Sequence, residues 1–324
     1  MTADESGIRL DRWFRRHFPG LPQNAVQKLC RTGQIRVDGH RADAARRLAS
    51  GQAVRIPPMP ADRLKEPWIP PPTDPRIEKD LLRLVLYHDE YLMVINKPHG
   101  LPVQGGPGIT RHLDAMLDAL RFGSPERPRL VHRLDRDTSG VLLLARTPGT
   151  AARLAALFRT GAIDKTYWAV TARRPTLREG RITLPLARVT DGRGQRTAVA
   201  APGSKEAARA ITDYRTLDHA GQKLAWLELR PRTGRTHQLR VHCVAMGAPI
   251  LGDTKYARPD QNRAFSATVE GLSDDLHLHA RSLCLPHPGG GKLLVEAELP
   301  PHMAATFRIL GFRAGPARPA RLEP

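Results

Sequence analysis

The densest run of polar side chains in the sequence, HRLDRDTSG at residues 132–140, stands directly before the apolar segment VLLLA at 141–145. Catalytic groups favour loops that a rigid element holds in place. Asp135 lies close to Arg133 and Arg136, and neighbouring cations favour the ionised form of a carboxylate. An ionised carboxylate is what a nucleophile or a general base requires. A surface turn with local ion pairs has the same composition, so both interpretations remain open from these residues alone.

A second polar run, GRTHQLRVH at residues 234–242, leads into a predicted helix over 236–246. Leu239, Cys243 and Met246 mark the face of this helix that we expect to be buried. A helix N-terminus preceded by Gly-Arg is suited to bind a phosphate or a carboxylate. A basic helix that faces solvent is the alternative interpretation.

The histidines do not form a metal-binding pattern. His237 and His242 are five residues apart and therefore do not share a helix face, while His277 and His279 alternate along a predicted strand. No HExxH or zinc-deaminase pattern joins them. Histidines of the core or the surface are the better interpretation, and we expect no metal.

The common cofactor and acyl-transfer motifs are also missing. The loop GGPG at 105–108 is followed by no GK[ST] and is not a dinucleotide fingerprint. Ser139 lies in TSG rather than in GxSxG. We therefore expect no cofactor, and a chemistry that uses a carboxylate among arginines.

The elements that must position these runs fall into two groups. Residues 7–56 predict two helices, a hairpin with Asp-Gly at its turn, and a short strand. Beyond residue 81 the patterns predict a larger α+β domain. Its strands are expected at 85–87, 92–95, 141–145 and 167–171 and in two arms at 179–200 and 209–230, and its helices at 111–121, 149–159 and 236–246. We expect domains at 1–58 and 81–312, a Pro-rich linker at 59–80, and a disordered tail at 313–324.

Charge identifies the class of partner. The 324 residues include 51 Lys or Arg and 32 Asp or Glu, a formal net charge of +19. Residues 7–56 alone hold eleven Lys or Arg and three Asp. Such a chain favours a polyanion, and nucleic acid before a membrane surface.

The remaining features concern compartment and assembly. The three cysteines, Cys30, Cys243 and Cys284, lie far apart, and no apolar stretch or N-terminal segment resembles a membrane span or signal peptide. We expect a bacterial cytoplasmic protein without a membrane partner, and a monomer.

Several motifs, taken together and in order, resemble those of the RluA family of RNA pseudouridine synthases. The run at 132–140 resembles the family's HRLDxxTSG signature. The segments that agree with further motifs are NKPHG at 96–100 with VQGG at 103–106, KTYWAV at 165–170, the run at 234–242 with GAPILGD at 247–253, and LHLHA at 276–280. The resemblance covers residues 81–312 or so.

The N-terminal segment resembles the S4-like (α-L) RNA-binding domain. Its RLDRW at 9–13 and GQIRVDG at 33–39 match that domain's opening and hairpin. The ending VRIPP at 54–58 and the VQGG loop look most like the RluC/RluD-like branch, which modifies large-subunit ribosomal RNA. The resemblance implies an S4-like domain beside a catalytic domain with a mixed, largely antiparallel central sheet.

The resemblance also implies the reaction and the residues that perform it. Uridine in RNA would be flipped out and isomerised to pseudouridine, with Asp135 attacking the ribose or accepting a proton. Tyr167 would stack on the base and could assist proton removal at C5, and Arg240 would pair with Asp135. Asp137 would have a structural role. The residues expected to contact RNA are His132, Arg133, Lys165, Arg235 and Leu239 in the catalytic domain and Arg12, Arg15, Arg16 and Arg31 in the N-terminal one.

Three alternatives remain. A non-catalytic RNA-binding or ribosome-assembly factor could have the same domains, although Asp135, Tyr167 and Arg240 argue against it. An N-glycosidase usually needs a second carboxylate and a positioned water. The same isomerisation could act on transfer RNA. The target uridine, and whether the substrate is free RNA or a ribosomal particle, cannot be read from the residues.

Overall fold

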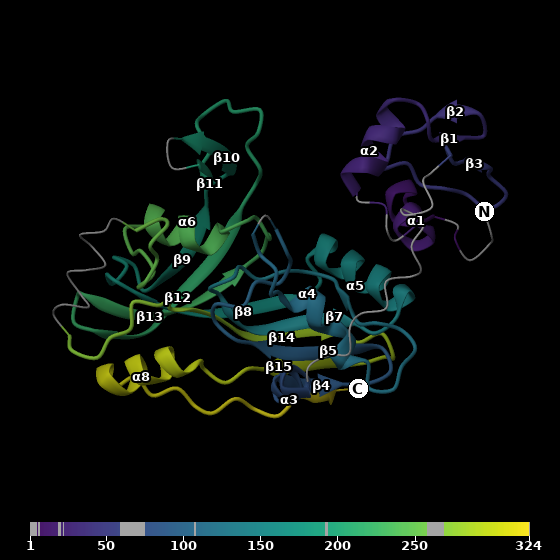
Figure 1. Cartoon of the computed structure of the whole chain (residues 1–324). Helices are drawn as coiled ribbons and strands as arrows, with labels where there is room; N and C mark the ends of the chain where they lie inside the picture. The colour runs from purple at the N-terminus through teal and green to yellow at the C-terminus, as the bar shows by residue number, and fades with distance from the viewer. Residues whose placement is uncertain are drawn as a thin grey trace. The chain divides into compact units, whose positions relative to one another are not determined.

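A computed structural model describes residues 5, 7–18, 21, 23–58, 75–106, 108–191, 194–257 and 269–323 (Figure 1). The chain forms two compact units, Met1–Pro72 and Thr73–Pro324. Most of the predicted linker, residues 59–74, lies outside the described residues. Its last part does not continue as a linker, because residues 75–80 belong to a helix.

The elements of the first unit are α1 (Leu10–His17), α2 (Gln23–Arg31), β1 (Arg36–Val37), β2 (His40–Arg41) and β3 (Val54–Arg55). The three strands form an antiparallel sheet in the order β2-β1-β3. Leu10 and Phe14 of α1 pack with Val26 of α2 and with Ile35 and Val37 beside and within the sheet. One apolar stripe on each helix thus closes a core of its own under a small sheet.

The second unit contains a longer series of elements. They are α3 (Pro75–Leu82), β4 (Val85–His88), β5 (Leu92–Lys97), α4 (Leu113–Met116), the 3-10 helix η3 (Leu117–Leu120), β6 (Arg129–Leu130), β7 (Ser139–Ala145), α5 (Pro148–Thr160), β8 (Asp164–Thr171), β9 (Glu179–Thr183), β10 (Leu186–Asp191), β11 (Gly194–Val199), β12 (Ile211–Ala220), β13 (Leu224–Pro231), α6 (Gln238–Ala245), β14 (Leu278–Pro286), β15 (Lys292–Glu296), α8 (Pro301–Leu310) and β16 (Arg321–Glu323).

Eleven of these strands form one sheet, whose main path runs β4-β5-β7-β14-β8-β13-β12-β9. Among the described strands only β7 and β14 pair in parallel, with His279 opposite Ser139 and Ala280 opposite Gly140. The predicted mixed, mostly antiparallel sheet is therefore confirmed. The predicted helix over 111–121 is shorter and consists of α4 followed by the η3 turn.

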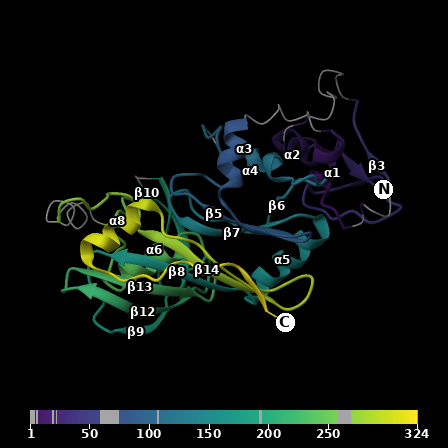
Figure 2. The same ribbon diagram turned by 90° about the horizontal axis from the view of Figure 1, so that it is seen from below.

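Both faces of the sheet are covered, which explains why β7 is apolar at successive positions. Leu142 and Leu144 pack towards α4 and η3, whereas Val141 and Leu143 pack towards α5. Figure 2 shows α4 and α5 on opposite sides of β5 and β7. In the same way α6 and α8 cover opposite faces of β13 (Figure 1). Because helices pack on both faces, β7 and β8 lie in the rigid centre of the second unit, and the loop before β7 is attached to that centre.

Strands β10 and β11 pair only with each other and stand off the main sheet beside α6 (Figure 1). No helix in the described part of the chain is long and apolar enough to cross a membrane.

The prediction of a disordered tail is wrong for residues 321–323, which form β16. β16 pairs antiparallel with β15, with Leu322 opposite Leu293. The backbone N–H groups of Ala317 and Arg318 donate to Glu298 and Glu296. Composition alone misled the prediction, because β15 offers an unpaired edge to which the segment can add.

Candidate active site

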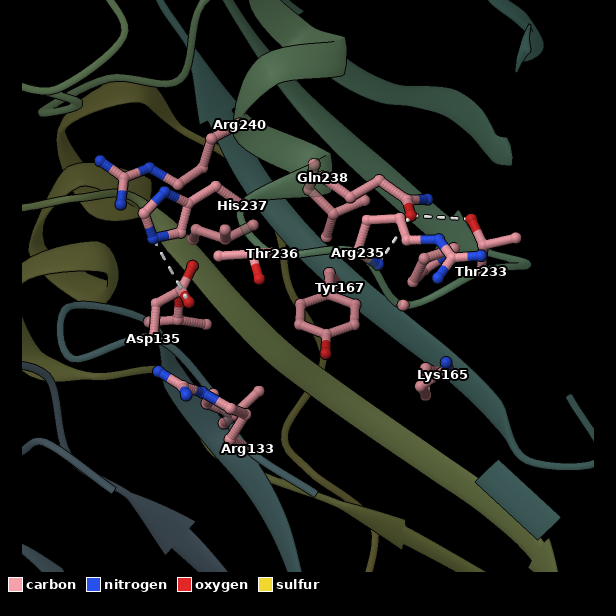
Figure 3. Close-up of a pocket in the computed structure, with 16 residues that line it drawn as sticks. Arg133, Asp135, Lys165, Tyr167, Thr233, Arg235, Thr236, His237, Gln238 and Arg240 are labelled. Carbon is pink, nitrogen blue, oxygen red and sulfur yellow. Dashed lines mark hydrogen bonds and ion pairs between the residues drawn. The ribbon is translucent and has the colours of Figure 1, made fainter. Parts of the chain in front are cut away.

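The two polar runs, about a hundred residues apart in the sequence, meet in one pocket of about 170 Å³ (Figure 3). The loop before β7 contributes Arg133 and Asp135, and β8 contributes Lys165 and Tyr167. The turn between β13 and α6, together with the first residues of α6, closes the other side.

The loop that carries Asp135 is anchored at several points. Leu134 is buried in the core cluster under α4. The fully buried Lys97 Nζ donates to the carbonyl oxygens of Pro98, Leu101 and Arg136 at 2.8–2.9 Å. Burial lowers the pKa of Lys97 to about 7, against the opposing charges of Asp137 and Asp135. The loop is thus held from beneath while the Asp135 side chain remains accessible.

Asp137 behaves differently from Asp135. Burial is the largest single influence and would raise its pKa, but the ion pair with Arg136, at 2.9 Å, together with the charges of His99 and Arg240, lowers it. Asp137 does not line the pocket, in keeping with the structural role assigned to it.

Tyr167 presents its phenol to the pocket near Asp135, between the turn before α6 and Lys165 (Figure 3). Its ring packs against the core cluster under α6, to which Leu239 belongs. Burial raises the pKa of Tyr167, and the charge of Asp135 raises it further. A protonated phenol with an apolar ring therefore faces the pocket, which is suited to stack on a flat base.

The partner of Arg240 differs from the predicted one. Its guanidinium forms two hydrogen bonds with Asp253, at 2.8 and 2.6 Å, rather than an ion pair with Asp135. Both side chains are nearly or fully inaccessible. Burial is the largest single influence and opposes the charge of Arg240, but the Asp253 pair, with smaller contributions from Asp135 and Tyr256, raises its pKa. A bidentate carboxylate satisfies a buried guanidinium better than the partly exposed Asp135 can, which explains the difference.

The nearest ionisable neighbour of Asp135 is instead His237. Its Nε2 lies 3.6 Å from Asp135 Oδ1. His237 precedes α6 with a φ of 53°, in the left-handed region that few residues other than glycine adopt. Helix α6 therefore begins two residues later than predicted, and an imidazole stands at its N-terminus.

His132 does not line the pocket, unlike the other residues of this unit that are predicted to contact RNA. Its Nε2 accepts a hydrogen bond from the backbone N–H of Leu143 at 2.8 Å, and its ring stacks on Phe158 at 4.5 Å. Burial lowers the pKa of His132 to about 3. A neutral imidazole thus ties the polar loop to β7.

The other predicted contacts in this unit do line the pocket. Arg133 and Arg235 are exposed on it, Leu239 is buried beneath it, and Lys165 is half-buried at one end. Burial lowers the pKa of Lys165, against the opposing charge of Asp164. These three basic side chains and an apolar floor surround the phenol and the carboxylate.

The predicted arginines of the first unit lie in another body of the chain. Arg12, Arg16 and Arg31 are exposed on α1 and α2. The side chain of Arg15 lies outside the described residues.

Four residues that form or support this site have no role predicted from the sequence: Lys97, His237, Gln238 and Tyr256. Gln238 is buried and accepts from Thr233 Oγ1 and from the backbone N–H of Arg235, which shapes the turn before α6. Lys97, His237 and Gln238 lie within the family motifs, which was their only signal, whereas Tyr256 lies in none of them. Their contacts join distant segments, so spacing along the chain could not show them.

A sequence model described as RNA pseudouridylate synthase matches residues 91–245, which include Asp135, Tyr167 and Arg240. The chain is 34% identical to ribosomal large subunit pseudouridine synthase C of Escherichia coli K12, over 92% of each chain. It is also 34% identical to RNA pseudouridine synthase 4, mitochondrial, of Arabidopsis thaliana, over 96% of this chain and 81% of that one.

Solved structures agree with these similarities. The human RNA pseudouridylate synthase domain containing 4 superposes with a TM-score of 0.62 at 32% identity, covering 74% of this chain and 97% of that one. A second human protein, RNA pseudouridylate synthase domain containing 1, superposes with a TM-score of 0.54 at 28% identity and covers 67% of this chain.

Proposed function

The chain belongs to the RNA pseudouridine synthase family, and from this premise we propose that it isomerises specific uridines of large-subunit ribosomal RNA through Asp135. The observation that carries the proposal is that Asp135 and Tyr167 face one pocket on a strongly basic protein. The large-subunit relatives, similar over nearly the whole chain, support this choice of RNA.

In the proposed reaction the bond between C1′ and N1 of the nucleotide breaks, the base turns, and a bond forms between C1′ and C5. C5 loses its proton and N1 gains one, so the product is an isomer. Asp135 either attacks the ribose or accepts a ribose proton to give a glycal-like intermediate. Both routes require an accessible carboxylate, and Asp135 is partly exposed to the pocket.

The target base must leave its stack before this chemistry can occur. Flipping costs a few kcal/mol. We propose that stacking on Tyr167 above the apolar Leu239 offsets part of this cost, and that Arg133 occupies the gap in the RNA. Lys165 and Arg235 would hold the neighbouring phosphates.

We further propose that the first unit is an S4-like RNA-binding domain. Its two helices carry exposed Arg12, Arg16 and Arg31 on a self-contained core. It would bind structured RNA through phosphates and shape while the second unit takes a single nucleotide.

The test is carbodiimide-based mapping of pseudouridine in total RNA from cells with the gene, without it, and with Asp135→Asn. We expect specific large-subunit sites to be lost without the gene and with the Asn variant, which should still bind RNA. Asn keeps the shape of the side chain but removes its charge.

Loss of sites in transfer RNA alone would retain the reaction and overturn the substrate. An active Asn variant would refute the role of Asp135. Unchanged sites, with RNA binding intact, would favour a non-catalytic RNA-binding protein.

A further inference from the structure

His237 occupies an unusual position for an unassigned residue. It adopts a left-handed backbone conformation immediately before α6, and such conformations, which cost free energy, cluster at functional sites where the surrounding structure holds them. Its side chain is mostly buried, between Asp135 on one side and Tyr256 on the other. The strained backbone thus places one imidazole between the reactive carboxylate and a phenol.

The hydrogen bonds of Tyr256 favour one tautomer of His237. The backbone N–H of Thr197, in β11, donates to the Tyr256 oxygen at 3.2 Å. The phenol O–H is then free to donate to His237 Nδ1, 2.6 Å away. With Nδ1 as acceptor, the neutral ring carries its proton on Nε2, which is the atom directed towards Asp135.

We propose that His237 is a positioning residue for Asp135: Tyr256 holds the imidazole in the Nε2–H tautomer, and that N–H orients the carboxylate through Oδ1. The other carboxylate oxygen, Oδ2, is then the one that meets the ribose. This inference rests on the proposed function. The 3.6 Å separation is longer than a hydrogen bond, and such contacts in empty sites commonly shorten when substrate binds.

The charges around His237 favour the neutral ring that this arrangement needs. Burial is the largest influence and lowers the pKa of His237, and Arg240 and Lys255 lower it further. Asp135 and Asp253 act in the opposite direction without reversing the shift. At neutral pH the ring is therefore uncharged, and its single proton has one preferred place.

Two substitutions at this position separate positioning from a purely structural role. His237→Gln places an amide N–H near the place of Nε2, where it can reach Asp135. His237→Asn reaches only as far as Nδ1, but asparagine tolerates the left-handed backbone better than glutamine does. A structural role predicts that Asn is the milder change, and positioning predicts that Gln is.

The experiment measures single-turnover pseudouridine formation with full-length protein in excess over RNA from cells that lack the gene. RNA binding and thermal unfolding are measured in parallel. We expect His237→Asn to lower the rate at least about 10-fold, the usual effect of losing a hydrogen bond to a charged group. We expect His237→Gln to stay within about threefold of the wild type, although it is the less stable variant.

Tyr256→Phe tests the tautomer. It keeps the ring that packs on Arg240, 5.1 Å from the guanidinium carbon, and removes only the hydroxyl. We expect the rate to fall severalfold in the wild-type background and not to fall in the His237→Gln background, because an amide has no tautomer to choose.

A His237→Asn variant as fast as the wild type would overturn the inference and leave the proposed function standing. The same holds if Gln and Asn slow the reaction equally, or if Tyr256→Phe acts equally in both backgrounds. A wild type that forms no pseudouridine would overturn the proposed function, and the inference with it.

Discussion

Asp135, Tyr167 and His237 share one pocket although they come from a loop, a strand and a helix start. The three side chains differ in accessibility and in the form in which their surroundings hold them. Asp135 remains accessible, Tyr167 is held as a phenol, and His237 is held as a neutral ring. In the proposed reaction the site would offer a carboxylate to the ribose and an aromatic face to the base, and among the described residues no second carboxylate lines the pocket. This composition favours isomerisation over glycosidic hydrolysis.

Tyr167 separates the contributions of ring and hydroxyl. We expect Tyr167→Leu to react about 10-fold more slowly than Tyr167→Phe, because Leu removes the stacking surface that Phe keeps. The difference between the wild type and Phe then reports the contribution of the hydroxyl. Single-turnover rates at saturating protein give both values, and equal rates for Phe and Leu would contradict stacking.

The parallel pairing of β7 with β14 fixes the position of the chain at the end of the Asp135 loop. Ser139 Oγ hydrogen-bonds to His279 Nδ1 at 2.9 Å across this contact. Gly140 follows with a φ of 106° and lies against the backbone of Ala280. Directly after the loop, the chain is therefore held by the side chain of Ser139 and by the close approach of the Gly140 backbone to Ala280.

Gly140→Ala should be severely destabilising. An added Cβ would lie 2.2 Å from the carbonyl oxygen of Ala280, a position that neither strand can vacate cheaply. We expect the free energy of unfolding to fall by more than about 3 kcal/mol, measured by urea denaturation.

Gly221→Ala is the matched control for Gly140→Ala. Gly221 also has a positive φ, of 62°, but no atom lies within 4 Å of the added Cβ. It should cost only about 1 kcal/mol of backbone strain. Similar effects of the two substitutions would show that the close approach is not what matters.

Two histidines at the start of β14 predict acid sensitivity. His277 and His279 are fully buried, and burial lowers the pKa of each to about 4. Below pH 6.5 the unfolded chain binds protons that the folded chain does not, so stability is lost as the pH falls from 6.5 towards 4. At pH 5 each histidine should cost about 2 kcal/mol.

The measurement compares urea unfolding at pH 7 and pH 5. His279→Asn should reduce the loss on acidification, whatever its effect at pH 7. His219→Asn, at an exposed position, should leave that loss as in the wild type. An unchanged loss in His279→Asn would exclude His279 as its source.

At the scale of the whole molecule, a net charge of +19 is distributed over two compact units. The first unit has no residue in the described pocket. Its exposed arginines are therefore expected to affect RNA affinity and salt dependence rather than the rate of the chemical step.

The triple variant Arg12→Ala, Arg16→Ala and Arg31→Ala tests that division. If each arginine contacts a phosphate, the magnitude of the slope of log affinity against log salt should decrease by about 2–3, and the single-turnover rate at saturation should not change. Deletion of residues 1–60 should act in the same direction on binding. Filter binding between 50 and 200 mM salt measures the slope.

Three exposed arginines of the C-terminal segment provide the control, because their removal changes the net charge equally. They are Arg313, Arg318 and Arg321. An equal effect of both triple variants would mean that net charge, rather than the surface of the first unit, determines binding.

The sequence by itself determined the family, the reaction and the mostly antiparallel sheet. Each motif consists of residues that are adjacent in the sequence, such as 132–140 and 165–170, so it can be identified without the tertiary structure. Apolar periodicity likewise indicated β7 and α5, because a strand or helix reports its buried faces along its own length.

Only the tertiary structure decided which charges meet. Arg240 pairs with Asp253 and His237 approaches Asp135, whereas the sequence predicted an Arg240–Asp135 pair. Burial selects between such partners, since a buried guanidinium needs a fully bidentate carboxylate and an accessible one does not. Burial and the pairing of β16 depend on contacts between distant segments, and spacing along one chain contains no measure of them.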